Sequence, residues 1–348
     1  RLMAFNFAES FEKFTSKTEL QRFYFTDEGA SSVLSIDSTH GRWGTPCLKV
    51  AINLAGSTLV NAWIQKDCPA VSGNTHVSHF AIKFNALPTA TGGGFGIWSA
   101  IDLGFTTTQV WLRLNTDLTL SMLRGSTVLA TSTRALALNR YHYIELKTTV
   151  RTSTNGSVDV RVDNETTGWI SASGINTANA GTDGWGFTRL GMNVGPTLGQ
   201  SRGNALVMYF DDWLVLDGSG GALDDWQGQV WGNKRKPTAE TASSQDWTPS
   251  TGTDNSANVD DSDPNSDTDY NSSSTVNHRD LFVLEDVSAA SPTILCYQPY
   301  LVMRKAHAGS ASVASTMKQS STEYPEAGQN PGTSYTGHMF PIRLNPAT

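Results

Sequence analysis

The amino-acid sequence predicts an all-β protein in which a two-sheet antiparallel β-sandwich (a jelly roll) is followed by a smaller β-domain. Apolar and polar residues alternate in YHYIELKTTV (141–150) and again in VDVRVD (158–163). This period of two is typical of strands with one buried and one solvated face. Charged residues make up only 16% of the chain, and there are 31 glycines. Such a composition favours many short strands and turns over long helices.

The elements are expected in chain order as one short helix and two groups of strands. Ser16 and Glu19 have the spacing of a capping box, which predicts a helix of at most a few turns. Asn155-Gly156 separates the two alternating stretches, and both residues tolerate the positive φ of a hairpin loop. Beside those stretches, the first group comprises a short strand near 5–11 and strands at 32–37, 47–54, 57–65, 76–85, 95–101, 109–115, 117–123, 126–132, 185–194 and 205–217. The second group comprises 280–286, 293–306, 312–319 and 338–344.

The composition changes after Asp217, where the run Gly218-Ser219-Gly220-Gly221 predicts a linker. A polar region rich in Ser, Thr, Asp and Asn follows, and it has too few apolar residues to pack a core of its own. We expect it to be disordered or to lie across a neighbouring surface. The predicted organisation is a sandwich at 1–217, a linker and connecting strand at 218–236, a polar acidic excursion at 237–279 and a small β-domain at 280–348.

Charge and hydropathy exclude several classes of partner. The formal net charge is −7, and the basic cluster Lys234-Arg235-Lys236 is too small to form a nucleic-acid binding face. No apolar run approaches the length of a membrane span, and the first residues show no signal-peptide core. We therefore expect no nucleic-acid partner and no membrane insertion, and no motif in the sequence indicates a cofactor.

The three cysteines, Cys47, Cys68 and Cys296, are too few for a disulfide scaffold and lack the close paired spacing of a zinc site. Free and mostly buried thiols are the preferred interpretation. A Cys47–Cys68 bridge between neighbouring strands is the alternative.

Acidic side chains do not form a recognisable catalytic pair. A glycosidase needs two carboxylates at a defined separation, but Glu145 and Asp159 have no acidic partner on their own strands. We expect both to lie on solvated strand faces. His76 and His79 point to opposite faces of one strand and are not expected to share a metal.

A weak calcium candidate lies in the acidic region. Asp261, Asp263 and Asp267 alternate as the oxygen ligands of a calcium loop would. However, the sixth and twelfth positions of such a loop are Ser266 and Ser272 rather than Gly and Glu. A solvated acidic loop is therefore the preferred interpretation.

The ten tryptophans allow two interpretations. Core packing is preferred for most of them, because an indole buries a large apolar area. An indole exposed on a sheet could instead stack on a sugar ring, and the candidates are Trp98, Trp111, Trp169 and Trp185. Trp185 has the most loop-like context, so the predicted carbohydrate-binding residues are Trp185, Trp111 and Trp98.

The order of several segments resembles a known group of proteins. These segments are FNFAESFEKFTSKTELQRFYF, GRWGTPCLKV, YHYIELKTTV with VDVRVD, MYFDDWLVLDGSGG, LDDWQGQVWGNKRKPTAETASSQDWTPSTG, VDDSDPNSDTDYNSSST and DLFVLEDV. Their succession resembles the concanavalin A-like (laminin-G-like) jelly-roll proteins of tailed-phage structural modules and covers nearly the whole chain. The resemblance implies a concanavalin A-like jelly roll with a small C-terminal β-domain.

The resemblance also implies a non-enzymatic function on the exterior of a bacteriophage virion. We expect a tail- or fibre-associated protein that attaches to a host-surface glycan, made in the host cytoplasm and assembled with other virion proteins and with itself as a homo-oligomer. A capsid decoration protein is one alternative. A free carbohydrate-binding module and, last, a glycosidase are the others.

Overall fold

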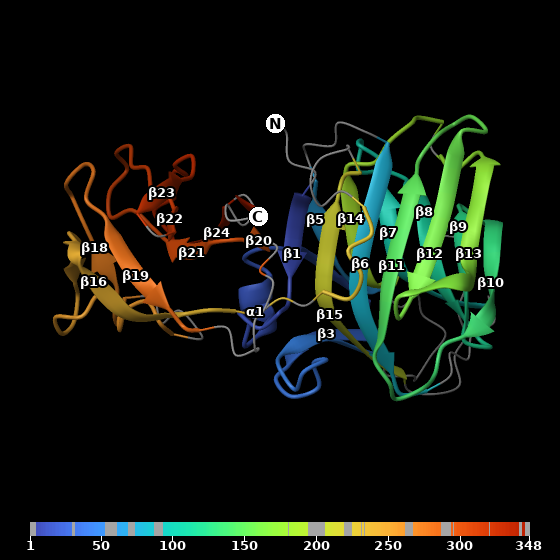
Figure 1. The fold of residues 1–348 in the computed structure, drawn as a ribbon, viewed down its shortest axis with the longest axis horizontal. Helices are drawn as coiled ribbons and strands as arrows, with labels where there is room; N and C mark the ends of the chain where they lie inside the picture. Colours follow the sequence, from blue (N-terminus) through green and yellow to red (C-terminus); the bar gives the residue numbers. More distant parts are fainter. Residues whose placement is uncertain are drawn as a thin grey trace. The chain divides into compact units, whose positions relative to one another are not determined.

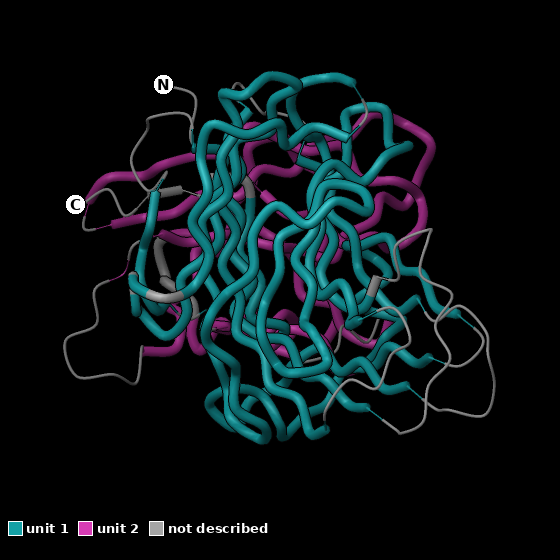
Figure 2. Tube along the Cα trace, turned by 90° about the vertical axis from the view of Figure 1, so that its right-hand side faces the viewer, with its two compact units in different colours: residues 1–11, 16–232 teal, residues 12–15, 233–348 magenta. Residues whose placement is uncertain are grey.

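The protein, represented by a computed structural model, divides into two compact units (Figure 2). The first unit comprises residues 1–11 and 16–232, and the second comprises 12–15 and 233–348. The structure describes residues 5–29, 32–52, 61–68, 74–86, 93–179, 181–193, 206–218, 225–230, 232, 234–261, 267–286, 294, 296–319, 321–340 and 343–344.

The first unit is a β-sandwich of two antiparallel sheets, which confirms the predicted fold class (Figure 1). Among the described residues, one sheet has eight strands in the order β13-β12-β11-β6-β15-β4-β3, with β1 paired to β15. The other has seven in the order β10-β9-β8-β7-β14-β5-β2. The eight-stranded sheet consists of β1 Phe5–Glu9, β3 Ser32–Asp37, β4 Cys47–Ile52, β6 Thr75–Phe84, β11 His142–Thr149, β12 Gly156–Val162, β13 Glu165–Ile175 and β15 Leu206–Leu216. The seven-stranded sheet consists of β2 Phe25–Glu28, β5 Ala62–Asp67, β7 Gly94–Ile101, β8 Thr108–Asn115, β9 Thr119–Arg124, β10 Thr127–Ala135 and β14 Phe187–Asn193.

The core lies between the two sheets, as the alternating pattern predicts. Leu146 of β11 and Val160 of β12 are paired across the two strands and are buried. The other sheet closes the core with Trp98 of β7, whose ring lies 4.9 Å from the ring of His76 on β6. Burial of such side chains is the main stabilising contribution, at about 25 cal/mol per Å² of apolar surface.

The hairpin turns differ from the expectation. Asn155 and Gly156 lie at the start of β12, between the two alternating stretches as predicted, but neither adopts a positive φ. Gly156 is required for another reason, because a Cβ atom there would collide with Thr177 Oγ1. The positive φ angles lie instead at Asp163 (55°) and Asn164 (65°), which form the two-residue turn into β13. Two such residues match the twist of a hairpin, and β13 is a strand that the pattern did not predict.

The predicted helix start is confirmed. The helix α1 spans Lys17–Leu20, and the side chain of its N-cap, Ser16, accepts a hydrogen bond of 3.3 Å from Glu19 N. This bond satisfies one of the amide groups that a helix leaves unpaired at its start. The helix is a single turn.

The second unit is built from pairs of short antiparallel strands. In its described part the pairs are β16–β19, β17–β18, β20–β25, β21–β24 and β22–β23. Their bounds are β16 Pro237–Gln245, β17 Thr248–Pro249, β18 Asn271–Ser272, β19 Asp280–Leu284, β20 Cys296–Tyr297, β21 Tyr300–Met303, β22 Thr316–Gln319, β23 Thr322–Pro325, β24 Thr336–Met339 and β25 Arg343–Leu344. The region predicted as a polar excursion therefore contributes β16, β17 and β18.

Hydrogen bonds, rather than apolar packing, hold this polar region together. The buried Asn255 donates from Nδ2 to Trp247 O and to Asp280 Oδ2, both at 2.8 Å. Asn271 donates from Nδ2 to Asn255 O at 2.7 Å. Side-chain amides thus replace the missing apolar core, which explains how a segment of this composition holds a defined shape.

The cysteines agree with the preferred interpretation of free and mostly buried thiols. Cys47, Cys68 and Cys296 are free thiols, so the alternative of a Cys47–Cys68 bridge is wrong. Burial raises the pKa of Cys47 to about 12. In the part of the chain that the structure describes, no helix is long and apolar enough to cross a membrane.

Candidate functional site

One row of side chains crosses the seven-stranded sheet on a single face. Strand register aligns Phe25 of β2 with Gln65 of β5, Gln65 with Arg189 of β14, Arg189 with Ser99 of β7, and Ser99 with Trp111 of β8. Residues directly opposite each other in antiparallel strands point to the same side of the sheet. The row therefore combines an amide, a guanidinium, a hydroxyl and two aromatic rings.

This row faces away from the eight-stranded sheet. The neighbouring positions Ile64, Leu190 and Trp98 are also aligned with one another, and all three are buried. Trp98 contacts His76 of the opposite sheet, so this second set points into the core. Because successive side chains of a strand point to opposite faces, Gln65, Arg189 and Ser99 lie on the outer face.

Arg189 is held rigidly but lacks a counter-ion. Its Nε donates to Gln65 Oε1 at 2.8 Å, and its guanidinium lies 3.9 Å from the centre of the Trp63 ring. No carboxylate in the described residues forms an ion pair with it, although the side chain is half-buried. Burial lowers the pKa of Arg189, and the more distant Asp27 acts in the opposite direction. A half-buried cation without a partner is costly to the fold and is well placed to bind an anion.

Two polar atoms beside Arg189 are buried without a partner in the described part of the chain. Gln65 Nε2 and Ser99 Oγ form no hydrogen bond with any described residue. An unsatisfied buried polar group costs about 1–3 kcal/mol. Such groups are rare in folded proteins, and one explanation is a ligand or ion that pairs with them. Both atoms lie beneath the surface, so Arg189, on the strand between them, is the one of these three residues that is open to solvent.

A second guanidinium lies on the same face. Arg113 follows Trp111 by two positions on β8, so both side chains point outward. Its Nε donates to Asn115 Oδ1 at 2.7 Å. It forms no ion pair within the described ranges, and burial lowers its pKa while Asp117 opposes that shift. Arg113 and Arg189 thus place two guanidinium groups on the outer face of this sheet, although the chain as a whole is acidic.

The outer face of the eight-stranded sheet is different, because a segment of the same unit covers it. Residues 225–230 and 232, called the covering segment here, bond to acidic groups of the sheet. Gly228 N donates to Glu145 Oε1 at 2.9 Å, and Gly232 N donates to Asp212 Oδ1 at 2.9 Å. Glu145 is only 2% exposed and lies 3.6 Å from the buried His79. The predicted solvated position of Glu145 is wrong, because the sequence pattern does not reveal this cover.

A shallow pocket with a volume of 290 Å³ remains beside the covering segment, lined in part by Lys147, Arg161 and Trp226. One of its two cations has a counter-ion, and the other stacks on an indole as Arg189 does. Lys147 forms an ion pair of 3.0 Å with Asp225, and the Arg161 guanidinium lies 3.9 Å from the centre of the Trp226 ring. Asp159, at the pocket wall, accepts a hydrogen bond from a serine of β13. This pocket presents less unsatisfied binding capacity than the row on the seven-stranded sheet.

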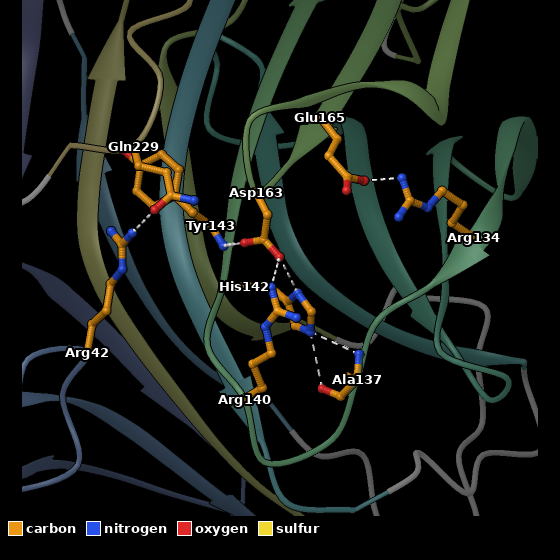
Figure 3. A network of polar contacts seen from close by, with 9 residues as sticks. All are labelled: Arg42, Arg134, Ala137, Arg140, His142, Tyr143, Asp163, Glu165 and Gln229. Carbon is orange, nitrogen blue, oxygen red and sulfur yellow. Dashed lines mark hydrogen bonds and ion pairs between the residues drawn. The ribbon is translucent and has the colours of Figure 1, made fainter.

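A histidine–aspartate pair at the start of β11 is structural (Figure 3). His142 Nδ1 lies 2.8 Å from Asp163 Oδ2, as in many catalytic pairs. However, the other ring nitrogen accepts from Ala137 N at 2.9 Å, so it is not available to a substrate. Asp163 also accepts from Tyr143 N and from Arg140. These bonds hold the chain entering β11 against the turn that follows β12.

The predicted carbohydrate-binding tryptophans do not form a common site. Trp185 and Trp98 are at most 1% exposed and pack against His76 in the core, so neither can stack on a sugar at the surface. The loop-like context of Trp185 misleads because the chain folds inward just before β14. Trp111 does lie in the outer row, but it is buried and its Nε1 donates to Gly125 O. Trp169 is half-buried under the Arg134 guanidinium.

The described part of the calcium candidate shows no metal site. Asp267 accepts from Arg304 at 2.6 Å and from Tyr335 at 3.1 Å, so its carboxylate is already paired. Asp261 has interactions of its own, and Asp263 lies outside the described residues. Among the residues that the structure describes, no group of three His, Cys, Asp or Glu side chains could hold a metal ion.

Sequence reasoning missed Arg189 and Gln65, which carry the candidate site. Each is a single polar residue at an outward position of a predicted strand, and nothing in the local pattern separates it from other polar positions. The sequence did contain a weak signal for Arg189. It precedes the apolar Leu190 in the predicted strand segment FTRLG, and a charged side chain in such a strand points away from the core. Only the strand register shows that β5 and β14 bring the two together.

No family model and no curated protein matches the sequence. Several solved structures are similar in fold. One is the endo-β-1,4-glucuronan lyase from the fungus Trichoderma reesei, with a TM-score of 0.48, 12% identity, and coverage of 61% of this chain and 95% of that chain. Another is the PL-14 alginate lyase from Aplysia kurodai, with a TM-score of 0.46, 14% identity, and coverage of 61% and 98%. A sialidase aligns with a TM-score of 0.42 and 14% identity over 61% of this chain and 18% of that chain.

These comparisons correct the predicted function. The prediction of a non-enzymatic component of a virion exterior is contradicted: the solved structures named above are polysaccharide lyases and a sialidase, and none of them is described as a virion protein. The comparisons also give no support to the prediction that the protein is not an enzyme. The resemblance to phage jelly-roll proteins stays a prediction, since no family model matches. At these identities the activities belong to those proteins, and the binding properties of this chain must come from its own side chains.

Proposed function

We propose that the outer face of the seven-stranded sheet binds an acidic oligosaccharide. The observation that carries this proposal is Arg189, a half-buried guanidinium that is stacked on Trp63, fixed by Gln65 and free of any ion pair among the described residues. A guanidinium presents a planar fork of donors that matches a carboxylate in two parallel hydrogen bonds. A uronic acid supplies such a carboxylate.

The surroundings of Arg189 suit a sugar better than a free inorganic anion. Arg189 lies beside the Trp63 ring and the Gln65 amide, so a ligand at the guanidinium meets an apolar wall as well as a polar group, as a sugar requires and an inorganic anion does not. Arg113 adds a second guanidinium on the same face, which forms no ion pair with a described residue. Binding sites for small molecules combine apolar and aromatic walls with a few fixed polar groups, which is the composition of this row.

The test is isothermal titration calorimetry on the full chain, with a glucuronan tetrasaccharide and a neutral cellulose tetrasaccharide as ligands. We expect saturable binding of the acidic ligand only, weakened by added salt because the attraction is ionic. Arg189→Gln should reduce the affinity about 10- to 100-fold, since hydrogen bonds to a charged group contribute about 1.5–3 kcal/mol. New reducing ends in the same mixture would show that the site also cleaves its ligand.

Arg161→Gln is the matched control. Arg161 also stacks on an indole with its guanidinium 3.9 Å from the ring centre, but it lies on the other sheet. This variant should bind the acidic tetrasaccharide as the wild type does. Equal affinity for the neutral and acidic ligands, or unchanged affinity in Arg189→Gln, would refute the proposal.

A further inference from the structure

An exposed group of aromatic rings adjoins the Arg189 site. Phe25 is 58% exposed and Phe105 is 44% exposed, both unusually high for phenylalanine. Their ring centres are 6.4 Å apart, and Phe105 lies 4.8 Å from the ring of Phe187. Phe25 also lies 5.7 Å from the ring of Trp63. Phe25 and Phe105, with Phe187 and Trp63 beneath them, are called the aromatic platform.

The platform is continuous with the cation. The Trp63 ring contacts Phe25 and also stacks with the Arg189 guanidinium. Phe25 is also aligned with Gln65, the residue that fixes Arg189. Two strand spacings separate β2 from β14, so the exposed ring and the guanidinium belong to one stretch of surface roughly 10 Å across.

The backbone presents Phe105 in an unfavourable conformation. Its φ is 63°, in the left-handed region that a bulky side chain rarely occupies. The turn is held by Asp102, whose Oδ1 accepts from Thr106 N and from Thr107 N, both at 2.8 Å. A strained residue that keeps an apolar ring in solvent does not stabilise the fold. Such positions are concentrated at binding sites.

We propose that Phe25 and Phe105 form a stacking subsite for sugar rings next to the one whose carboxylate binds Arg189. The site then takes an oligosaccharide that runs across the strands from β14 towards β2, rather than a single acidic sugar. This inference rests on the proposed function. Flat aromatic rings in water stack on the apolar faces of sugars, whereas the charged group of the same ligand requires the guanidinium.

The experiment compares ligands of two lengths on the full chain. Calorimetry with glucuronic acid and with a glucuronan hexasaccharide is carried out on the wild type and on the double variant Phe25→Ala, Phe105→Ala. We expect the variant to lose about 10-fold or more in affinity for the hexasaccharide, because each ring contributes a stacking contact. The affinity for glucuronic acid should change less than about 2-fold, since Arg189 is untouched.

Two further variants sharpen the result. Val128→Ala removes another exposed apolar side chain, 47% exposed, from the opposite edge of the same sheet and should have no effect on either ligand. Phe25→Trp keeps a flat ring and should retain hexasaccharide binding. Because the replaced side chains are between 44% and 58% exposed, thermal unfolding should show that all variants fold.

The outcomes separate the two proposals. If the double variant binds the hexasaccharide as the wild type does while Arg189→Gln does not, the platform is refuted and the acidic site stands. If Arg189→Gln also binds normally, the acidic site itself is refuted. If the double variant only converts an oligomer into a monomer in sedimentation, with saccharide affinity unchanged, the platform is a contact between copies of this chain and the inference fails.

Discussion

Asp163→Asn should destabilise the first unit, because it removes the charge of a carboxylate while keeping its shape. Asp163 accepts from His142 Nδ1 at 2.8 Å, from Tyr143 N at 2.9 Å and from Arg140 at 3.0 Å. Asparagine tolerates the φ of 55° at this turn, so backbone strain does not enter. The asparagine oxygen can keep the Tyr143 bond, but its amide nitrogen then faces the N–H of His142. We expect a loss of about 1.5–3 kcal/mol, the range for one hydrogen bond to a charged group.

The pH dependence gives a second measure of the same contacts. Burial alone would raise the pKa of Asp163, but hydrogen bonds from His142 and from the Tyr143 amide outweigh it and lower the pKa. The unfolded chain therefore takes up a proton first as the pH falls. The stabilisation by Asp163 is complete above the unfolded pKa of about 3.9 and is lost as the pH falls through the lower folded pKa. The difference between wild type and variant should shrink over that range.

The assay is urea unfolding followed by tryptophan fluorescence, repeated between pH 7 and pH 3. Asp159→Asn is the control, because Asp159 is bound by one serine hydroxyl at the surface and should change stability by less than about 0.5 kcal/mol. A loss below about 0.5 kcal/mol for Asp163→Asn, or a difference that does not change with pH, would refute the reasoning.

Three other predictions follow from burial. Trp185→Ala should lower the free energy of unfolding by about 3–5 kcal/mol, because it leaves a cavity at a fully buried position. Urea titration measures this loss. Calorimetry should show an unchanged affinity for saccharides. Burial raises the pKa of Glu145, and the hydrogen bond from Gly228 opposes this shift only in part. The stability of the wild type should therefore decline as the pH rises from the pKa of Glu145 in the unfolded chain through its higher pKa in the folded protein. Glu145→Gln should remove that decline, and a parallel pH profile of unfolding in the two proteins would contradict this. Cys47 should resist iodoacetamide at pH 8 in the folded protein and react fully in urea, because burial raises its pKa to about 12; mass spectrometry of the labelled peptide decides this.

Local patterns in the sequence were sufficient for the architecture of the first unit. Alternation in β11 and β12 identified the buried face, since a period of two is a property of each strand alone. The capping hydrogen bond at Ser16 was also readable, because the interacting groups are three residues apart. The strand β13 was missed, because its sequence ETTGWISASGI has small and polar residues where a buried strand usually shows Val, Ile or Leu.

The candidate site required the tertiary structure. Arg189 and Gln65 are 124 positions apart in the chain, and only the pairing of β14 with β5 joins them. Whether a guanidinium has a counter-ion depends on every carboxylate that the fold brings near it, which a linear sequence does not contain. The burial of Glu145 could not be predicted from the sequence either, because the covering segment that bonds to it lies 83 positions away in the chain.

The sequence by itself determined the fold class, most strand positions of the first unit and the acidic, cysteine-poor character of the chain, because these depend on composition and short-range periodicity. The tertiary structure alone decided which tryptophans are buried, which charges are paired and which face is available to a ligand. The physical reason is that burial and ion pairing are properties of distant segments in contact. The outer face of the seven-stranded sheet is defined by such contacts, from Phe25 at one edge to Trp111 four strands away.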